Sequence, residues 1–170
     1  LSAGARTHSN SYGAPTGGAY TADDATSDRF LFDHEEMTIF FSAGNNGSGA
    51  NTIGSPGNSK NVVTVGALGS DNSTTVASFS SRGPSADGRR KPDIMAPGQS
   101  VTSALGDTSH SSNNCGTQGL QGTSMSCPTT AGGAALLRQY FEDGYYPTGA
   151  ASAADSLGAI APLVKAALLN

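Results

Sequence analysis

Short runs rich in β-branched and aromatic residues recur along the chain and have the composition of β-strands. Two of them, residues 37–44 (MTIFFSAG) and 61–67 (NVVTVGA), are almost entirely apolar, as is typical of strands covered on both faces. Three further runs have strand character: residues 6–11, 92–98 and, more weakly, 100–105. The pattern therefore predicts four strands and a candidate fifth, with the two apolar runs at the centre of a sheet.

Segments with helical patterning lie between or after these runs, at residues 22–36, 124–142 and 162–169. The apolar stripe of the second segment is wide, which predicts a largely buried helix. Strands that alternate with helices, with apolar strands in the middle, indicate an α/β fold with a parallel sheet. We expect residues 1–170 to belong to one domain.

The composition narrows the class of protein further. The chain of 170 residues is rich in glycine, and its formal net charge is −4. A weakly acidic chain without a basic patch offers no electrostatic footprint for nucleic acid or an anionic membrane. No apolar run approaches the length that spans a bilayer. We therefore expect neither nucleic acid nor a membrane among its partners.

The chemistry of the chain centres on Ser124, in the stretch QGTSMSCP at residues 121–128. The serine stands at the predicted start of a helix, where backbone N–H groups lack partners and the helix dipole favours negative charge. A nucleophilic serine there would have its anionic intermediate stabilised. The alternative on helix-start chemistry alone is that Thr123 or Ser124 simply caps the helix.

Five segments together favour the nucleophile. In chain order they are residues 10–21 (NSYGAPTGGAYT), 41–47 (FSAGNNG), 79–84 (FSSRGP), 91–98 (KPDIMAPG) and 122–137 (GTSMSCPTTAGGAALL). They resemble the landmarks of the subtilisin-like serine proteases, in the family's order and over nearly the whole chain. The first segment is similar to the large secreted bacterial alkaline proteases, including the oxidatively stable ones. The resemblance implies a three-layer α/β sandwich with a mostly parallel sheet, a serine endopeptidase activity and a secreted protein.

The resemblance also assigns roles to individual residues. Ser124 matches the nucleophile, and Asn45 matches the side chain that donates to the oxyanion together with the Ser124 N–H. The residues that match substrate-binding positions are Ser11, Tyr12, Gly13, Ser42, Ala43, Gly44, Gly54 and Met125. The first three match an edge strand that pairs with the substrate backbone. The next three match one wall of the pocket for the residue before the scissile bond, and Gly54 matches the small residue at its base. Met125 matches the oxidation-sensitive position beside the nucleophile.

A nucleophilic serine needs a base and an orienting carboxylate, and the family carries its Asp and His before the oxyanion asparagine. No segment of this chain resembles either one. We expect His8, His34 and His110 to be structural or exposed, because none has a catalytic context. We therefore expect residues 1–170 to be the C-terminal part of a catalytic domain. Its expected partners are a protein or peptide substrate and the missing N-terminal half, or another copy of the chain.

Several lesser features remain open from the sequence. Cys115 and Cys127 could form a disulfide in a secreted protein or be two free thiols. Three neighbouring carboxylates, Asp23, Asp24 and Asp28, could ligate calcium, but we interpret them as an acidic helix start. The resemblance implies catalysis without a cofactor or metal, although the complete domain could hold a structural calcium ion. It also implies a cis peptide before Pro56.

Two other functions are alternatives to the endopeptidase. The first is a catalytically inactive, peptide-binding or structural remnant of a subtilase, which would keep the pocket and lack a working base. The second is a lipase or esterase, which needs a G-x-S-x-G elbow. The stretch GTSMS has no glycine two residues after the serine, and this argues against the second rival.

Overall fold

The computed structural model of the chain describes residues 2–69, 74–109 and 111–170, with a four-stranded parallel sheet at its centre. The strands lie in the sheet in chain order: β1 (Thr7–Asn10), β2 (Thr38–Ser42), β3 (Val63–Leu68) and β4 (Ile94–Pro97). A separate antiparallel hairpin contains β5 (Val101–Ala104) and β6 (Thr117–Leu120). The helices are α1 (Ala22–Asp33), α2 (Thr123–Glu142) and α3 (Ala161–Leu169), with a 3₁₀ turn at Ala153–Asp155.

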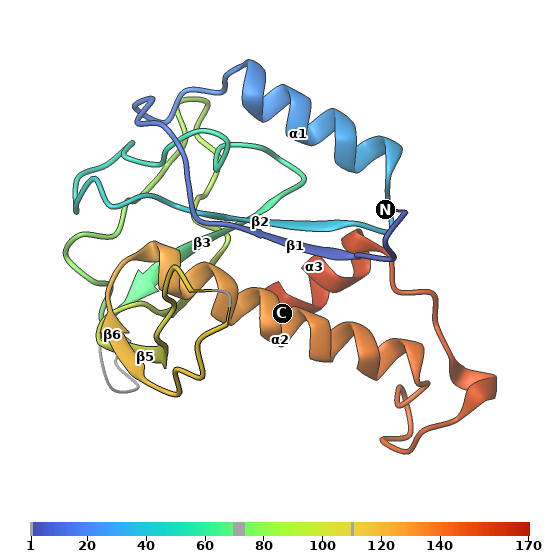
Figure 1. Cartoon of the computed structure of the whole chain (residues 1–170). Helices are drawn as coiled ribbons and strands as arrows, with labels where there is room; N and C mark the ends of the chain where they lie inside the picture. The colour runs from blue at the N-terminus through green and yellow to red at the C-terminus, as the bar shows by residue number, and fades with distance from the viewer. Residues whose placement is uncertain (1, 70–73, 110) are drawn as a thin grey trace.

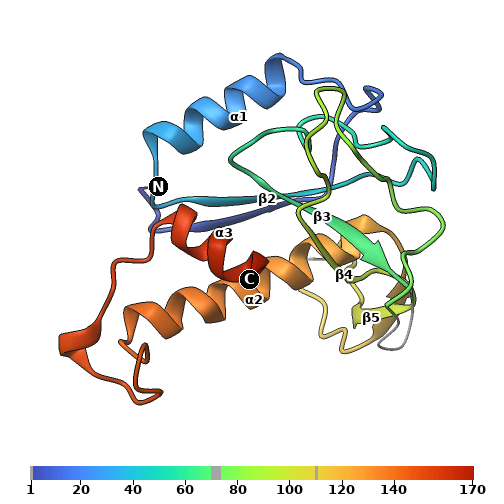
Figure 2. The ribbon, with the colours of Figure 1, turned by 180° about the vertical axis from the view of Figure 1, so that it is seen from behind.

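The elements form three layers. Helix α1 covers one face of the sheet, and α2 and α3 cover the other, as Figure 1 and the opposite view in Figure 2 show. The predicted three-layer α/β sandwich with a mostly parallel sheet is therefore confirmed.

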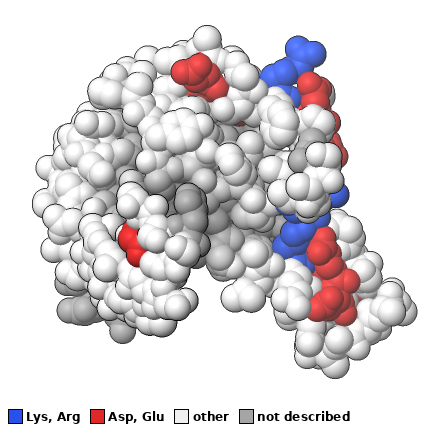
Figure 3. Space-filling model, viewed as in Figure 1, with Lys and Arg blue, Asp and Glu red and all other residues white. Residues whose placement is uncertain are grey.

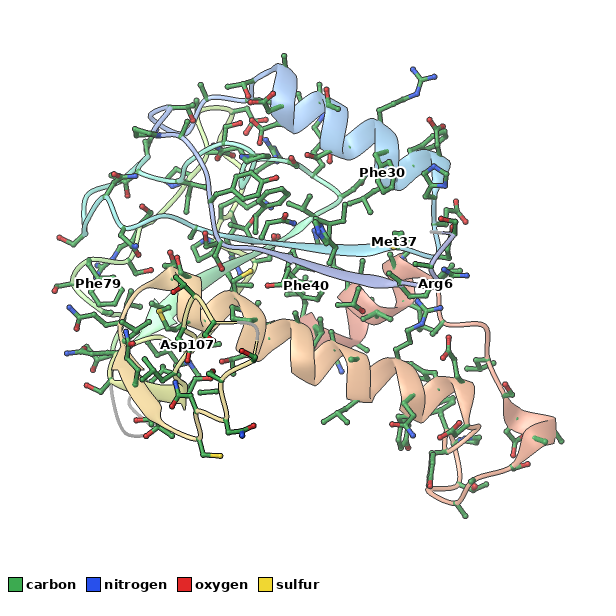
Figure 4. All side chains as sticks on the ribbon, in the orientation of Figure 1. Arg6, Phe30, Met37, Phe40, Phe79 and Asp107 are labelled. Atoms are coloured by element: carbon green, nitrogen blue, oxygen red, sulfur yellow. The ribbon has the colours of Figure 1, made fainter. Side chains whose placement is uncertain are left out.

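Strand β2 explains why the molecule has a core on each side of the sheet. Successive side chains of a strand point to opposite faces. Phe40 therefore packs with α2 and α3, among residues such as Ala131 and Val164, whereas Phe41 packs with Leu31 of α1. Figure 4 shows Phe40 between the sheet and α2. Each face of β2 thus carries a large aromatic side chain that fixes a helical layer to the sheet.

The structure differs from the sequence expectation by more than two residues at the end of one helix, and it has one strand more than expected. The first helix ends at Asp33 instead of residue 36, because His34 leaves the helical conformation and a turn, Met37 N–H to His34 carbonyl, brings Met37 into the core. Strand β6 was not predicted, because its four residues, TQGL, are all exposed and show no alternation. The candidate strand at 100–105 is real and pairs with β6.

Charged side chains are unevenly distributed. On the face seen in Figure 3 they gather towards the carboxyl ends of α1 and α2, whereas the surface over the β5–β6 hairpin is almost uncharged. Within the described ranges, no helix combines the length and the apolar character that a bilayer crossing requires.

Candidate active site

The parallel strands deliver their carboxyl ends to the amino end of α2. The chain leaves β1 and β2 on the side of the molecule where α2 begins (Figure 1). Functional residues of open parallel sheets collect at such carboxyl ends. The predicted site residues therefore come from three places: the segments after β1 and β2, and the first turn of α2.

Gly122 shapes the entry into α2. Its φ of 143° lies in a region that side chains other than glycine rarely adopt, and its N–H donates to the Gly98 carbonyl at 2.7 Å. A Cβ on Gly122 would lie 3.3 Å from the Asn45 Nδ2 atom. Glycine thus allows the start of α2 to approach the Asn45 side chain closely.

Thr123 fixes the orientation of the Asn45 amide. The Thr123 backbone N–H and its Oγ1 hydroxyl each donate to Asn45 Oδ1 at 3.0 Å, and the hydroxyl accepts from the Gly44 N–H at 3.2 Å. Because the amide oxygen is occupied twice, the amide presents its nitrogen as the free donor. The Asn45 Nδ2 atom is thereby held beside the first turn of α2.

Ser124 is the second residue of α2 and is half-buried. Its carbonyl accepts a hydrogen bond from Ser11 Oγ at 3.0 Å, which ties the segment after β1 to the helix start. The Ser124 N–H belongs to the first-turn donors that have no acceptor inside the helix. This N–H and the Asn45 amide are therefore two donors that border one site, at the positive end of a helix of 20 residues.

A cavity of about 220 Å³ brings the predicted residues together. Its lining includes Ser11, Tyr12, Gly13, Ser42, Ala43, Gly44, Asn45, Gly54 and Ser124. Tyr12 is 65% exposed and packs edge-on against Phe41, with 5.6 Å between the ring centroids. Met125 does not belong to this lining, although it follows Ser124 directly. The cavity lining contains no charged residue.

The turn at residues 54–58 contributes its first residue, Gly54, to the lining of this cavity. The Gly54 N–H donates to the Ala43 carbonyl at 3.1 Å. Ser55 and Ala14 exchange two backbone hydrogen bonds, each of 2.9 Å. The Ser55–Pro56 peptide is cis, which confirms the prediction from the resemblance. The turn is therefore bonded to the segments that follow both β1 and β2.

No histidine within the described ranges lies beside Ser124. The His8 ring contacts the Asn10 side chain on β1, three residues before Ser11, which corresponds to about 10 Å of extended chain. His34 follows α1 and packs on Phe30, whose place in Figure 4 is the end of α1 remote from the amino end of α2. His110 lies outside the described residues.

The possible disulfide between Cys115 and Cys127 is not formed. Cys115 is an exposed free thiol, whereas Cys127 is a buried free thiol of α2 in the core below the sheet. The Cys127 Sγ atom lies 3.4 Å from Ser9 Oγ and from the Asn10 carbonyl. Burial raises the pKa of the Cys127 thiol, so it stays protonated and unreactive.

Two of the three clustered carboxylates have separate structural tasks, and the third, Asp23, is exposed. Asp24 accepts from the Thr21 N–H at 2.9 Å and from its hydroxyl at 3.0 Å, at the start of α1. Asp28 accepts from the backbone N–H groups of Lys60 and Asn61. Within the described ranges, no three acidic, histidine or cysteine side chains converge as metal ligands would.

Two residues of the site were missed by the sequence reasoning. Thr123 orients Asn45, and its place between Gly122 and Ser124 in the recognised motif could have indicated this role. Ser81 accepts from the Asn46 N–H at 3.1 Å and donates its own N–H to the Gly44 carbonyl at 2.9 Å. Ser81 lies in the motif FSSRGP, but its contacts join distant segments and cannot be deduced from spacing.

The fold and the site define a class: a parallel α/β domain in which a helix-start serine and an asparagine amide border one cavity. The sequence model of the subtilase family, Peptidase_S8, matches residues 2–170, and the chain belongs to this family of serine peptidases. The expectation from the motifs is thereby confirmed.

Individual relatives agree with this assignment. The chain is 44% identical over 119 residues to the serine protease AprX of Bacillus subtilis (strain 168), an alignment that covers 63% of this chain and 27% of AprX. It is 30% identical to the serine protease/ABC transporter B family protein tagD of Dictyostelium discoideum, over 99% of this chain and 14% of that protein. Sphericase has a similar structure, with a TM-score of 0.68 at 25% identity, over 98% of this chain and 49% of that chain. The chain thus spans about half of the matched structure and a smaller share of these relatives.

Proposed function

We propose that this chain supplies the nucleophile and the oxyanion donors of a serine endopeptidase. Ser124 Oγ attacks the carbonyl carbon of the scissile peptide bond while a base takes the hydroxyl proton. The base returns that proton to the leaving amine, and water then hydrolyses the acyl-enzyme. The negative oxygen of each tetrahedral intermediate accepts hydrogen bonds from the Ser124 N–H and Asn45 Nδ2.

One observation carries this proposal: Thr123 occupies the Asn45 amide oxygen with two hydrogen bonds of 3.0 Å and leaves its nitrogen as the donor beside Ser124. A helix-capping role for Ser124 would not require an asparagine from another element to be oriented in this way. The N-cap residue of α2 is moreover Gly122, not Ser124.

The surrounding cavity supports an extended peptide as the substrate. Residues 11–13 follow β1 without belonging to a strand, so their backbone groups are available to pair with a substrate strand. The cavity of about 220 Å³ has an uncharged lining. An ionised substrate side chain would lose its hydration there without gaining an opposite charge. We therefore expect preference for an uncharged residue before the scissile bond.

The base is proposed to come from a segment outside these 170 residues. Neither His8 nor His34 is placed to receive the Ser124 proton. The triad depends on spatial arrangement and not on one continuous chain, so a separate N-terminal half carrying Asp and His could complete it.

The test is labelling of Ser124 by a fluorophosphonate probe, located by mass spectrometry. The isolated chain should react slowly, and the chain combined with its Asp- and His-bearing segment should react fast and hydrolyse peptides. Ser124→Ala should abolish both reactions. Fast stoichiometric labelling of the isolated chain would show that a histidine of this chain, or of a second copy, is the base. No labelling of the complete domain would support the inactive remnant instead.

A further inference from the structure

A buried lysine lies in the segment before β4 and reaches a residue of β3. The Lys91 side chain is only 3% exposed, and its Nζ donates to Asp93 Oδ2 at 2.7 Å and to Thr64 Oγ1 at 2.9 Å. A buried ammonium is unfavourable unless it is paired and hydrogen-bonded. An apolar residue would fill this place at no such cost, so the contact to Thr64 calls for an explanation.

Thr64 connects this lysine to the cavity turn. Its hydroxyl accepts from Lys91 Nζ and donates to the Gly57 carbonyl at 2.5 Å. Its backbone is held as well, because its N–H donates to Asp93 Oδ2 at 2.7 Å and its carbonyl accepts from the Asp93 N–H at 2.9 Å. A fully buried hydroxyl with both roles filled has one orientation only.

Gly57 transmits this orientation to the cavity by direct packing. A Cβ on Gly57 would lie 2.8 Å from the Gly54 carbonyl oxygen and 3.2 Å from Thr64 Cγ2, so the turn rests on Thr64 without a gap. Gly54 lines the cavity and bonds to Ala43, which lines it too. A shift of Gly57 would therefore move one wall of the cavity.

We propose that Lys91 is a positioning residue for substrate binding: through Thr64 and Gly57 it fixes the turn at residues 54–58 that shapes the cavity beside Ser124. This inference rests on the proposed function, since it assigns that cavity to the substrate. Lys91 does not belong to the cavity lining, and the turn it holds contributes Gly54 to that lining and no proposed reacting group, so we expect its effect on KM and not on kcat.

Lys165 offers a matched control within the same charged cluster. Its Nζ lies 3.6 Å from Asp93 Oδ1 and donates to the carbonyls of Lys60 and Val62, so it fixes α3 to the sheet. Lys165 has no contact with Thr64. If the cluster merely stabilised the fold, the loss of either lysine would have the same kind of effect.

The charges around Lys91 give the proposal a pH signature. Asp93 faces its ammonium from the segment before β4, Lys165 from α3 and Arg89 from the preceding loop. Burial lowers the pKa of Lys91 to about 8 against the attraction of Asp93. Above that pH the neutral amine holds Thr64 and Asp93 more weakly. We therefore expect KM to rise on the alkaline side of about pH 8.

The experiment compares Lys91→Met, Thr64→Val, their double variant and Lys165→Met in the complete peptidase domain, with active sites counted by the fluorophosphonate probe. Lys91→Met and Thr64→Val should each raise KM about tenfold with little change in kcat, the effect of one lost buried hydrogen bond. The KM of the double variant should be no higher than that of either single variant. Thr64→Ser, which keeps the hydroxyl, should have the KM of the wild type. Lys165→Met should lower Tm and leave KM unchanged.

The outcomes separate this inference from the proposed function. If the probe labels Ser124 while KM stays unchanged in Thr64→Val and Lys91→Met, the positioning role is wrong and the proposed function stands. The same conclusion follows if Lys165→Met raises KM equally, or if Lys91→Met keeps the alkaline rise of KM. If Lys91→Met does not fold, Thr64→Val and Thr64→Ser decide the question. If the probe labels no complete domain, both proposals fail.

Discussion

At the scale of single residues, the proposed oxyanion site depends on which amide atom of Asn45 is left free to donate. Two hydrogen bonds from Thr123 fix the orientation of the amide, and Thr123 and Asn45 lie far apart in the sequence. The motif identifies the asparagine, but only the structure shows that a threonine at the start of α2 orients its side-chain amide. Thr123 is therefore as much part of the proposed oxyanion site as Asn45 itself.

The first prediction concerns this donor. In the complete enzyme, Asn45→Leu should lower kcat by about 10²- to 10³-fold with a small change in KM, a magnitude taken from subtilisin itself. The reason is that the oxyanion forms after substrate binding, so the donor acts mainly on the transition state. Steady-state kinetics with a peptide substrate measure it. Thr123→Val keeps the backbone donor to Asn45, so its kcat should lie between those of the wild type and Asn45→Leu. If Asn45→Leu instead raises KM and leaves kcat unchanged, Asn45 contributes to substrate binding and not to the chemical step.

The second prediction follows from the titration of Lys91. Its pKa is lowered by burial from 10.5 to about 8 in the folded protein. Between these values the unfolded chain holds a proton that the folded chain lacks, so unfolding takes up a proton and becomes less favourable as pH rises. The resulting gain in folding stability is absent below about pH 8 and complete above pH 10.5.

Urea unfolding across this range, in the inactive Ser124→Ala background, should therefore show a stability gain with pH that Lys91→Met loses. All other titrating groups are shared by the two proteins, so the difference between their curves isolates Lys91. Parallel curves would mean that the lysine keeps its ordinary pKa.

At the scale of elements, α1 begins at a buried carboxylate. Asp24 accepts from Thr21 at the helix start and from Ser59 Oγ at 3.2 Å, in the segment before β3. The same side chain thus caps the helix and fixes α1 to the turn that contains Pro56 and Ser59.

The third prediction tests this double role. Asp24→Ala should destabilise the domain by about 2 kcal/mol, because it removes the helix cap that accepts from the half-buried Thr21 N–H and breaks the contact to Ser59. The neighbouring Asp23, which is exposed, is the control, and Asp23→Ala should change stability by less than about 0.5 kcal/mol. If Asp24→Ala and Asp23→Ala lower the free energy of unfolding equally, Asp24 does not have this double role.

The elements also show which parts of the fold can be predicted from the sequence. The apolar runs that became β2 and β3 and the long stripe of α2 were predicted, because burial on both faces leaves a strong pattern. Strand β6 was not predicted, because an exposed hairpin strand needs no apolar alternation. Asn45 and Ser124 are found through motifs. Ser81 and Lys91 also lie in quoted motifs, but their contacts, like those of Thr64, join distant segments and cannot be deduced from the local sequence.

At the scale of the whole molecule, the sheet has an open side. β1 pairs with β2 on one edge only, and its other edge has no strand partner within the described residues. Large apolar side chains are exposed nearby and on α2, among them Tyr12 at 65% and Leu136 at 69%. An unpaired strand edge beside exposed apolar side chains favours association.

The fourth prediction is that the isolated chain self-associates. Sedimentation velocity should show a weight-average mass that rises with concentration, because β1 and the exposed side of α2 become buried between copies. Addition of the segment that carries Asp and His should replace these species with a 1:1 complex. If the chain stays monomeric at all concentrations and does not bind that segment, the unpaired edge of β1 is not an association surface.

The two thiols have a practical consequence, since they differ so strongly in surroundings. Cys115 is exposed in the segment between β5 and β6, and the hairpin runs directly into α2, whereas Cys127 is enclosed in the core. A maleimide dye should therefore attach to one sulfur per folded chain without any engineered cysteine. Such a dye would sit on the hairpin that leads to Ser124, and its emission could follow the arrival of a peptide in real time.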